Sequence, residues 1–203
     1  MNVQNKHLVA GLGNPGRKYC QTRHNVGFMV IDVLAARWKL ALGEKLRDID
    51  FGCCFLKETK VCLAKPLAYM NKSGPPIQQL ADRQHFRYED LIIVHDDIDL
   101  AFGTLKIKAK GGSGGHKGVR SIMETFGEGG FSRLRVGIGR PLPGFDVTDH
   151  VLGPFESSER EILVKMIDQA ADAVHTIIRE GILTAMNKFN RKLDVTDSTL
   201  DSR

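Results

Sequence analysis

The sequence predicts a single α/β domain with three layers, in which a twisted, mixed and mostly parallel β-sheet is flanked by helices. Short, strongly apolar segments of strand length alternate along the chain with segments whose apolar residues recur at helical spacing. The 203 residues, 42% hydrophobic and 26% charged, are enough for one compact core and contain no long linker or internal repeat. We assign the domain to residues 1–193 and expect a flexible polar tail at residues 194–203.

The first half of the chain contains a strand, a helix, a hairpin and a second helix. A buried strand is predicted from His7 to Gly13, followed by an Asn-Pro-Gly turn. A helix is predicted from about Asn25 to Leu40, because its apolar residues recur every three or four positions. Residues 51–56 and 60–64 predict a hairpin, and Ser73-Gly74-Pro75 opens a helix, since proline is tolerated in a first turn.

The second half alternates strands and helices in the same way. Strands are predicted at 91–95, at the lysine-bearing segment that follows, and at 133–139. Helices are predicted at 119–126, from a Ser158-x-x-Glu161 capping box to about Glu180, and at 183–191.

Composition excludes several protein classes. No apolar run reaches the roughly 18 residues of a membrane helix, and the N-terminus has no signal-peptide core before Gly11. We therefore expect a cytoplasmic protein without a membrane partner. The four cysteines (Cys20, Cys53, Cys54 and Cys62) show no C-x-x-C spacing, and Cys53 with Cys54 is a poor disulfide pair. We expect reduced thiols, with neither a zinc site nor a disulfide framework.

The positive charge is concentrated in one segment. The chain has a net charge of +5, but residues 103–141 contain eight basic and two acidic residues, so the remainder is slightly acidic. Alternation predicts that three lysines share one strand face and that two arginines follow the same pattern on another strand (Lys106, Lys108 and Lys110; Arg133 and Arg135). If the two strands are neighbours, these residues form a cationic strip suited to a polyanion; the alternative is an ordinary solvated sheet face.

Gly11-x-Gly13-x-x-Gly16 matches the dinucleotide-binding fingerprint and follows a predicted strand. That motif must open a helix directly, whereas Arg17-Lys18-Tyr19 intervenes here. Its acidic residue should end the next strand, but Asp32 lies within a helix. The context therefore disfavours dinucleotide binding.

Gly111-x-Ser113-x-Gly115 matches the nucleophile elbow of serine hydrolases, for which Asp146 and His150 would be the partners. An elbow is one tight, strained turn, whereas glycines on both sides of Ser113 predict a mobile loop. The glycine-rich segment GGSGGHKG offers unobstructed backbone N–H groups before a helix N-terminus, which favours a cradle for phosphates over a plain surface loop.

The acidic cluster Asp96-Asp97-x-Asp99 could hold magnesium through oxygen ligands. Alternatively, Asp97 and Asp99 face solvent, while Asp96 orients another side chain at the carboxyl end of its strand. Sites in open α/β sheets gather at such strand ends, so Asp96 is well placed for function without a metal.

Four polar residues are expected to meet at that edge of the sheet. Asn14 and Asp96 both follow apolar strands, His24 precedes the first long helix, and Asn71 follows the hairpin. A histidine with a carboxylate partner can take a proton from water, and amides can hold that water or stabilise an oxyanion. The sequence thus predicts hydrolysis without a metal, a cofactor or a covalent nucleophile.

Four stretches resemble the bacterial-type peptidyl-tRNA hydrolase family, in the family's order. They are GLGNPGRKYCQTRHNVGF (11–28), KPLAYMNKSG (65–74), VHDDIDLAFGTLKIKAKGGSGGHKGVRSI (94–122) and FSRLRVGIGRP (131–141). The resemblance implies hydrolysis of the ester that joins a peptide to the 3′ end of tRNA, which recycles tRNA from stalled translation. It also implies a monomer whose partner is the acceptor stem and 3′ end of peptidyl-tRNA.

The same resemblance implies roles for individual residues. His24 would be the general base, Asp96 would keep it in its proton-accepting form, and Asn14 would distinguish a blocked peptidyl group from a free amino acid. Asn71, with Tyr69 and Met70, would line the cleft for the peptide and terminal adenosine. Tyr19 is similar to a tRNA-contacting tyrosine of the family, and the basic segment would hold the acceptor-stem phosphates; the implied tRNA-binding residues are Tyr19, Lys108, His116, Lys117 and Arg135.

Two positions depart from the family pattern. Family members commonly carry GGHNG, whereas this chain has Lys117 in place of the asparagine. Lysine only donates hydrogen bonds and adds a charge, so we expect Lys117 to contact a phosphate instead. Tyr69 stands where phenylalanine is frequent and keeps a stacking surface. The rival hypothesis is a non-catalytic RNA-binding protein on the same fold, which would not need the Asn14, His24, Asn71 and Asp96 set.

Overall fold

The computed structural model describes residues 5–127 and 129–190, and these form one seven-stranded sheet of order β2-β3-β4-β1-β5-β7-β6. The four central strands β4, β1, β5 and β7 run parallel, while β2, β3 and β6 pair antiparallel at the two sides. The mixed sheet is thus confirmed, with its parallel part at the centre. The strands are β1 (Lys6–Gly11), β2 (Glu44–Leu46), β3 (Ile49–Leu56), β4 (Thr59–Pro66), β5 (Leu91–Asp97), β6 (Leu105–Lys108) and β7 (Ser132–Gly137).

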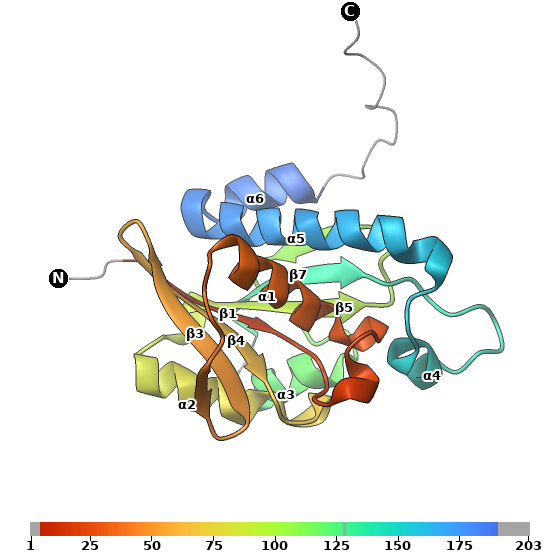
Figure 1. Cartoon of the computed structure of the whole chain (residues 1–203), viewed down its shortest axis with the longest axis horizontal. Helices are drawn as coiled ribbons and strands as arrows, with labels where there is room; N and C mark the ends of the chain where they lie inside the picture. The colour runs from red at the N-terminus through yellow and green to blue at the C-terminus, as the bar shows by residue number, and fades with distance from the viewer. Residues whose placement is uncertain (1–4, 128, 191–203) are drawn as a thin grey trace, which may run out of the picture.

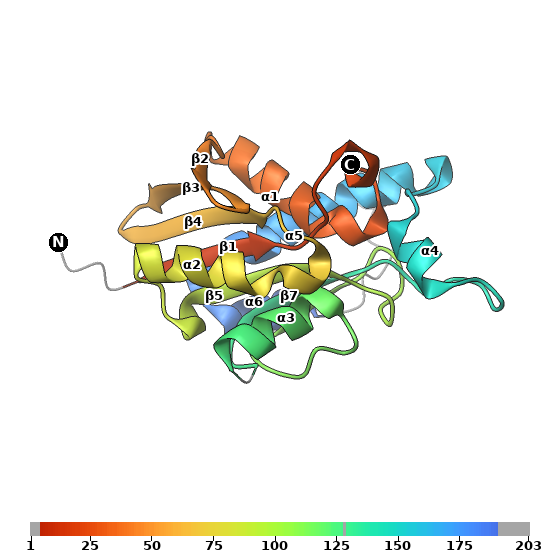
Figure 2. The ribbon, with the colours of Figure 1, turned by 90° about the horizontal axis from the view of Figure 1, so that it is seen from below.

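Helices cover both faces of the sheet. Figure 1 shows α1, α5 and α6 over one face, and Figure 2 shows α2 and α3 over the other. Helix α4 stands apart, beyond the carboxyl ends of the parallel strands. The helices are α1 (Val26–Arg37), α2 (Gly74–Gln84), α3 (Lys117–Phe126), α4 (Val147–Leu152), α5 (Arg160–Glu180) and α6 (Ile182–Phe189), with short 3-10 turns at η1 (Arg17–Tyr19), η2 (Arg23–Asn25), η3 (Met70–Lys72), η4 (Tyr88–Asp90) and η5 (Ser157–Glu159).

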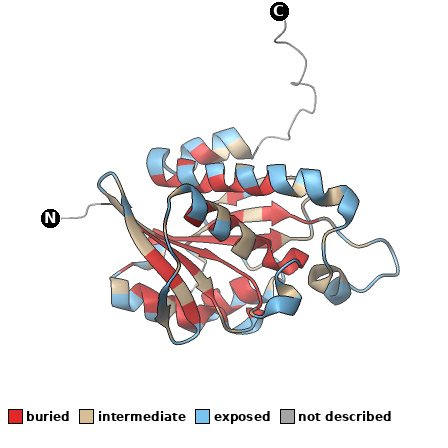
Figure 3. Ribbon diagram, in the orientation of Figure 1, coloured by how far each residue is buried: buried red, intermediate tan, exposed pale blue. Residues whose placement is uncertain are grey.

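The sheet is buried on both faces, which explains why its central strands are almost continuously apolar. Val9 and Val94 belong to the cluster under α1 and α5, whereas Leu8 and Ile93 belong to the cluster with α2 and α3. Figure 3 shows buried residues along the central strands and on the inward sides of the helices. This two-sided core fixes the carboxyl ends of the parallel strands at one edge.

Helix α1 packs directly on the backbone of the central strands. A Cβ atom on Gly27 would lie 2.5 Å from the backbone of Leu12 and 2.5 Å from the carbonyl oxygen of Val94. Only glycine allows this approach, which brings the start of α1 to the ends of β1 and β5. The residues just before α1, His24 among them, are positioned by this contact.

Besides the 3-10 turns, the structure adds one strand and one α-helix that the sequence pattern did not predict, β2 and α4. Both are too short for a periodic signal: β2 has three residues, and α4 has six residues with an Asp146 side chain as its N-cap. The capping box before α5 is formed by Glu156 and Glu159, so the predicted Ser158-x-x-Glu161 box is wrong. The predicted tail at 194–203 lies outside the described residues.

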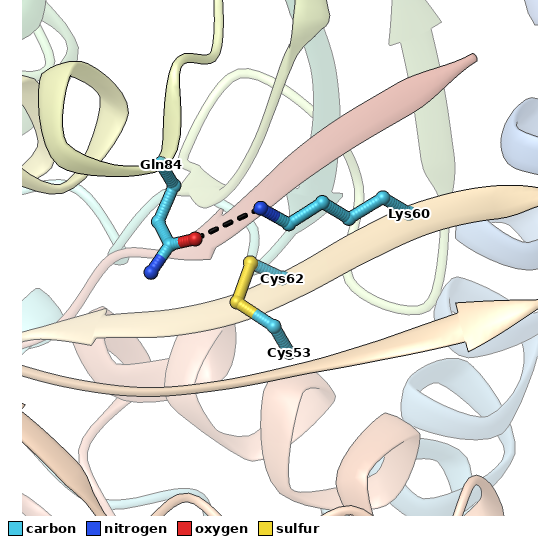
Figure 4. Close-up of a disulfide and its surroundings, with 4 residues drawn as sticks. All are labelled: Cys53, Lys60, Cys62 and Gln84. Carbon is cyan, nitrogen blue, oxygen red and sulfur yellow. Dashed lines mark hydrogen bonds between the residues drawn. A yellow bond between two sulfur atoms is a disulfide. The ribbon is translucent and has the colours of Figure 1, made fainter. Parts of the chain in front are cut away.

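The expectation that all four cysteines are reduced is wrong. Cys53 and Cys62 form a disulfide across β3 and β4, as Figure 4 shows, while Cys20 and Cys54 are free. The hairpin register places Cys53 directly opposite Cys62, a pairing that the spacing of the cysteines does not reveal. Among the described helices, none has the length and apolarity required to cross a membrane.

Candidate active site

A cavity of about 670 Å³ lies at the carboxyl edge of the parallel strands. Its wall combines the loop after β1, the η2 and η3 turns, the end of β5, the start of α3, and α4. Eight of the predicted site residues line it (Asn14, His24, Tyr69, Met70, Asn71, Asp96, His116 and Lys117). Tyr19, Lys108 and Arg135 do not line it. The structure therefore brings together residues from three separate stretches of the chain, 14–24, 69–71 and 96–117.

His24 and Asp96 are in direct contact. The Nδ1 atom of His24 lies 2.8 Å from Oδ1 of Asp96, whose side chain is 2% exposed. Because an ionised carboxylate can only accept, Nδ1 of His24 carries the proton and donates it to Asp96. The other ring nitrogen, Nε2, then has a free lone pair and is able to accept a proton.

His116 provides a second hydrogen bond to the same carboxylate oxygen. Its Nδ1 accepts from the backbone N–H groups of Gly118 and Val119, which makes it the N-cap of α3. The proton must therefore be on Nε2, which donates to Asp96 Oδ1 at 2.9 Å. Both ring nitrogens of His116 are occupied within the protein.

Asp96 remains a carboxylate in this environment. Burial alone would raise the pKa of Asp96, but electrostatic attraction and hydrogen bonds from His116 and His24 outweigh burial and hold that pKa far below its ordinary value. The cavity therefore contains a fixed negative charge directly behind the His24 ring.

His95 belongs to the same cluster, although nothing in the sequence pattern pointed to it beyond its place before Asp96. Its ring is buried and contacts the ring of His116 edge-on, with 4.7 Å between centroids. Burial, together with the nearby His116, lowers the pKa of His95 to about 3, so this ring is neutral. It packs against His116 without adding charge to the site.

Asn14 connects two walls of the cavity. Its backbone N–H and carbonyl both bond to the Asn25 side chain, which ties the end of β1 to the η2 turn. Its Oδ1 accepts from the backbone N–H of Met70 at 2.9 Å. The Asn14 Nδ2 group has no hydrogen-bond partner among the described residues. Tyr69, which also lines the cavity, is 61% exposed.

The two basic strands are neighbours, as the cationic strip requires. In the β6–β7 pairing, Lys106 lies opposite Arg135 and Lys108 opposite Arg133. The two arginines, however, are held internally: Arg133 is buried against carbonyl oxygens of the glycine-rich loop, and Arg135 pairs with Asp97. Strand β6 ends at Lys108, so the expectation that Lys110 shares its face is wrong. Lys106 and Lys108, unlike Arg135, have no ion-pair partner among the described residues.

The residues predicted for a serine-hydrolase triad and for a magnesium site make other contacts in the structure. Asp146 caps α4, and His150 Nε2 donates to the carbonyl of Gly139, so neither hydrogen-bonds to Ser113. Asp97 pairs with Arg135, and Asp99 pairs with an exposed arginine, Arg140.

His24, Asp96 and His116 also lie close enough together to be considered as metal ligands. In the arrangement described above, each imidazole nitrogen that faces Asp96 carries a proton. The three groups therefore satisfy one another, and a metal ion would have to displace both hydrogen bonds.

The chain is similar to known proteins along most of its length. The sequence profile of the family described as Peptidyl-tRNA hydrolase matches residues 8–197. The peptidyl-tRNA hydrolase of Bacillus subtilis is 42% identical over 92% of this chain and 99% of its own, and that of Geobacillus kaustophilus is 46% identical over 90% and 98%. The crystal structure of peptidyl-tRNA hydrolase from Acinetobacter baumannii superposes with a TM-score of 0.86 at 34% identity, covering 94% of this chain and 97% of that one. The chain belongs to the peptidyl-tRNA hydrolase family.

Proposed function

We propose that this protein hydrolyses the ester between a peptide and the 3′ end of tRNA, with His24 as the general base. The observation that carries the mechanism is the His24–Asp96 pair at the cavity. A buried carboxylate fixes the proton on Nδ1 and leaves Nε2 as the basic atom. Family membership supports the hydrolysis of peptidyl-tRNA, and the His24–Asp96 pair supports general-base catalysis by His24.

The steps follow from the atoms available. Nε2 of His24 takes a proton from water as the water oxygen attacks the ester carbonyl, which gives a tetrahedral oxyanion and an imidazolium. Asp96 stabilises the imidazolium, and the Asn71 amide is a candidate donor to the oxyanion. When the intermediate collapses, the imidazolium returns the proton to the 3′ oxygen of tRNA. No bond forms between the enzyme and the peptide.

Selection of a blocked amino group is assigned to Asn14. Its Oδ1 is committed to the N–H of Met70, so Nδ2 is the group left to donate. A peptide offers an amide carbonyl as an acceptor, whereas a free aminoacyl group carries an ammonium, which can only donate. The unblocked substrate therefore leaves the Asn14 N–H group unpaired.

Binding of tRNA is assigned to exposed aromatic and basic residues around the cavity. Tyr69 offers a stacking face for the terminal adenosine, and Lys117, at the first position of α3, offers a charge to a phosphate. Lys106 and Lys108 extend the positive surface along β6 for the acceptor stem. We further propose a cytoplasmic monomer.

The proposal is tested by release of N-acetyl-aminoacyl groups from tRNA by the purified protein. We expect turnover that persists in EDTA, no turnover of aminoacyl-tRNA with a free α-amine, and a loss of about 10²- to 10⁴-fold in His24→Ala. Ser113→Ala should retain activity; its complete inactivation would favour a serine nucleophile instead. Tight tRNA binding without release by the wild type would support the RNA-binding hypothesis.

A further inference from the structure

A second cavity, of about 460 Å³, lies on the other side of the Asn14 loop. It is bounded by residues 14–17, by α1, and by the facing strands β3 and β4. Phe28 and Met29 give it an apolar side, and Asp50 and Lys65 give it a polar side. Asn14 lines this cavity as well as the first one, so the two cavities meet at Asn14.

Asp50 is the unusual group in this second cavity. Its Oδ1 is buried and has no hydrogen-bond partner, and none of the described residues donates to its carboxylate. Lys65 lies directly opposite Asp50 in the β3–β4 pairing, yet it hydrogen-bonds to Asp32. Arg17, the remaining charged residue of the lining, is exposed.

An unpaired carboxylate in a partly desolvated position has a high free-energy cost, which a donor from outside the protein would reduce. Lys65 pairs with Asp32, and Arg17 is exposed, so Asp50 has no ion-pair partner among the described residues of this wall. The chemistry of the cavity therefore favours an N–H donor, with apolar contacts alongside. A peptide backbone or a peptide α-ammonium group has this chemistry.

The course of the peptide chain of the substrate relates the two cavities to each other. Under the proposed function, the esterified residue occupies the first cavity and its blocking amide contacts Asn14. A peptide that continues past Asn14 from that amide enters the second cavity, because Asn14 lines both cavities. We propose that the second cavity binds the peptide residues upstream of the esterified residue and that the Asp50 carboxylate accepts hydrogen bonds from their N–H groups.

This inference rests on the proposed function and makes a separate prediction about peptide length. N-acetyl-aminoacyl-tRNA is too short to use the second cavity, whereas N-acetyl-tripeptidyl-tRNA with the same esterified residue reaches it. For the wild type, kcat/KM should be at least about tenfold higher with the tripeptidyl substrate, the factor that corresponds to about 1.4 kcal/mol. Asp50→Leu should abolish that gain and leave kcat/KM for N-acetyl-aminoacyl-tRNA within about twofold.

Asp50→Asn keeps the shape and one acceptor oxygen, so it should reduce the length-dependent gain about threefold. If thermal unfolding shows that Asp50→Leu does not fold, Asp50→Asn replaces it as the test variant. Asp48→Asn, an exposed position on the same hairpin, is the matched control and should behave as the wild type. The inference is overturned if the wild type shows no gain with length, or if the Asp50 variants lose equal activity on both substrates. Failure of the proposed function looks different, because the wild type would then release neither substrate.

Discussion

Asp96→Asn isolates the charge behind His24 from the geometry that holds it. Both imidazole N–H groups bond to the same oxygen, Oδ1, at 2.8 and 2.9 Å. An asparagine with its carbonyl oxygen in that position keeps both hydrogen bonds, and the two donors disfavour the flipped amide. What the variant loses is the negative charge facing the imidazolium that forms during attack.

The loss of activity follows from the interaction energy between the Asp96 carboxylate and the imidazolium. Unit charges about 4 Å apart, at the effective dielectric of about 20 that suits protein sites, interact by about 4 kcal/mol. If the transition state carries most of the imidazolium charge, kcat should fall about a thousandfold in Asp96→Asn, with KM changed by less than about threefold. Steady-state release of N-acetyl amino acid from tRNA measures both constants.

Asp99→Asn is the control for this experiment, because Asp99 is half-exposed and pairs with Arg140 outside the cluster. It should leave kcat within about twofold of the wild type. A loss below about tenfold in Asp96→Asn, or a change confined to KM, would contradict the role given to the buried charge. Unchanged thermal unfolding would exclude a folding defect as the cause of a larger loss.

Three further predictions concern stability and tRNA binding. The pKa of His95 is lowered by burial to about 3 from 6.5, so its stabilising contribution is complete above pH 6.5 and is lost as the pH falls toward 3. Between pH 7.5 and 5.5, urea unfolding should show the wild type losing about 1.4 kcal/mol more than His95→Phe, and equal losses would refute this. Lys106→Ala with Lys108→Ala should weaken tRNA binding and flatten its salt dependence by about one slope unit per lost phosphate contact, while kcat at saturation stays unchanged; an unaltered slope would place tRNA elsewhere. Gly27→Ala should destabilise the fold by about 3 kcal/mol, because its Cβ would meet backbone atoms, whereas Gly43→Ala enters open space and should not change the melting temperature.

The part of the site that the sequence predicts is the part governed by strand direction. Asn14 and Asp96 each follow an apolar strand, and the carboxyl ends of parallel strands meet at one edge, so their convergence can be anticipated. His24 joins them because it precedes the helix that packs on those strands. The fold class follows from the same alternation of apolar strands and amphipathic helices.

The part that the sequence does not predict depends on register and on long-range hydrogen bonds. Alternation places Arg133 and Arg135 on a strand beside the lysines, but it does not show that loop carbonyls and Asp97 satisfy them. In the same way, nothing in the spacing of Cys53 and Cys62 shows that the hairpin places them face to face. Such contacts join distant segments, and local patterns carry no information about them.

The contacts of His116 give the glycine-rich segment a structural role that its sequence pattern does not predict. The glycine-rich segment predicts a phosphate cradle, yet its histidine gives one nitrogen to the start of α3 and the other to Asp96. The backbone N–H groups of Gly118 and Val119 fix which nitrogen of His116 is protonated, and that proton holds the oxygen to which His24 also donates. The start of α3 is therefore linked to His24 by a chain of hydrogen bonds through His116 and Asp96.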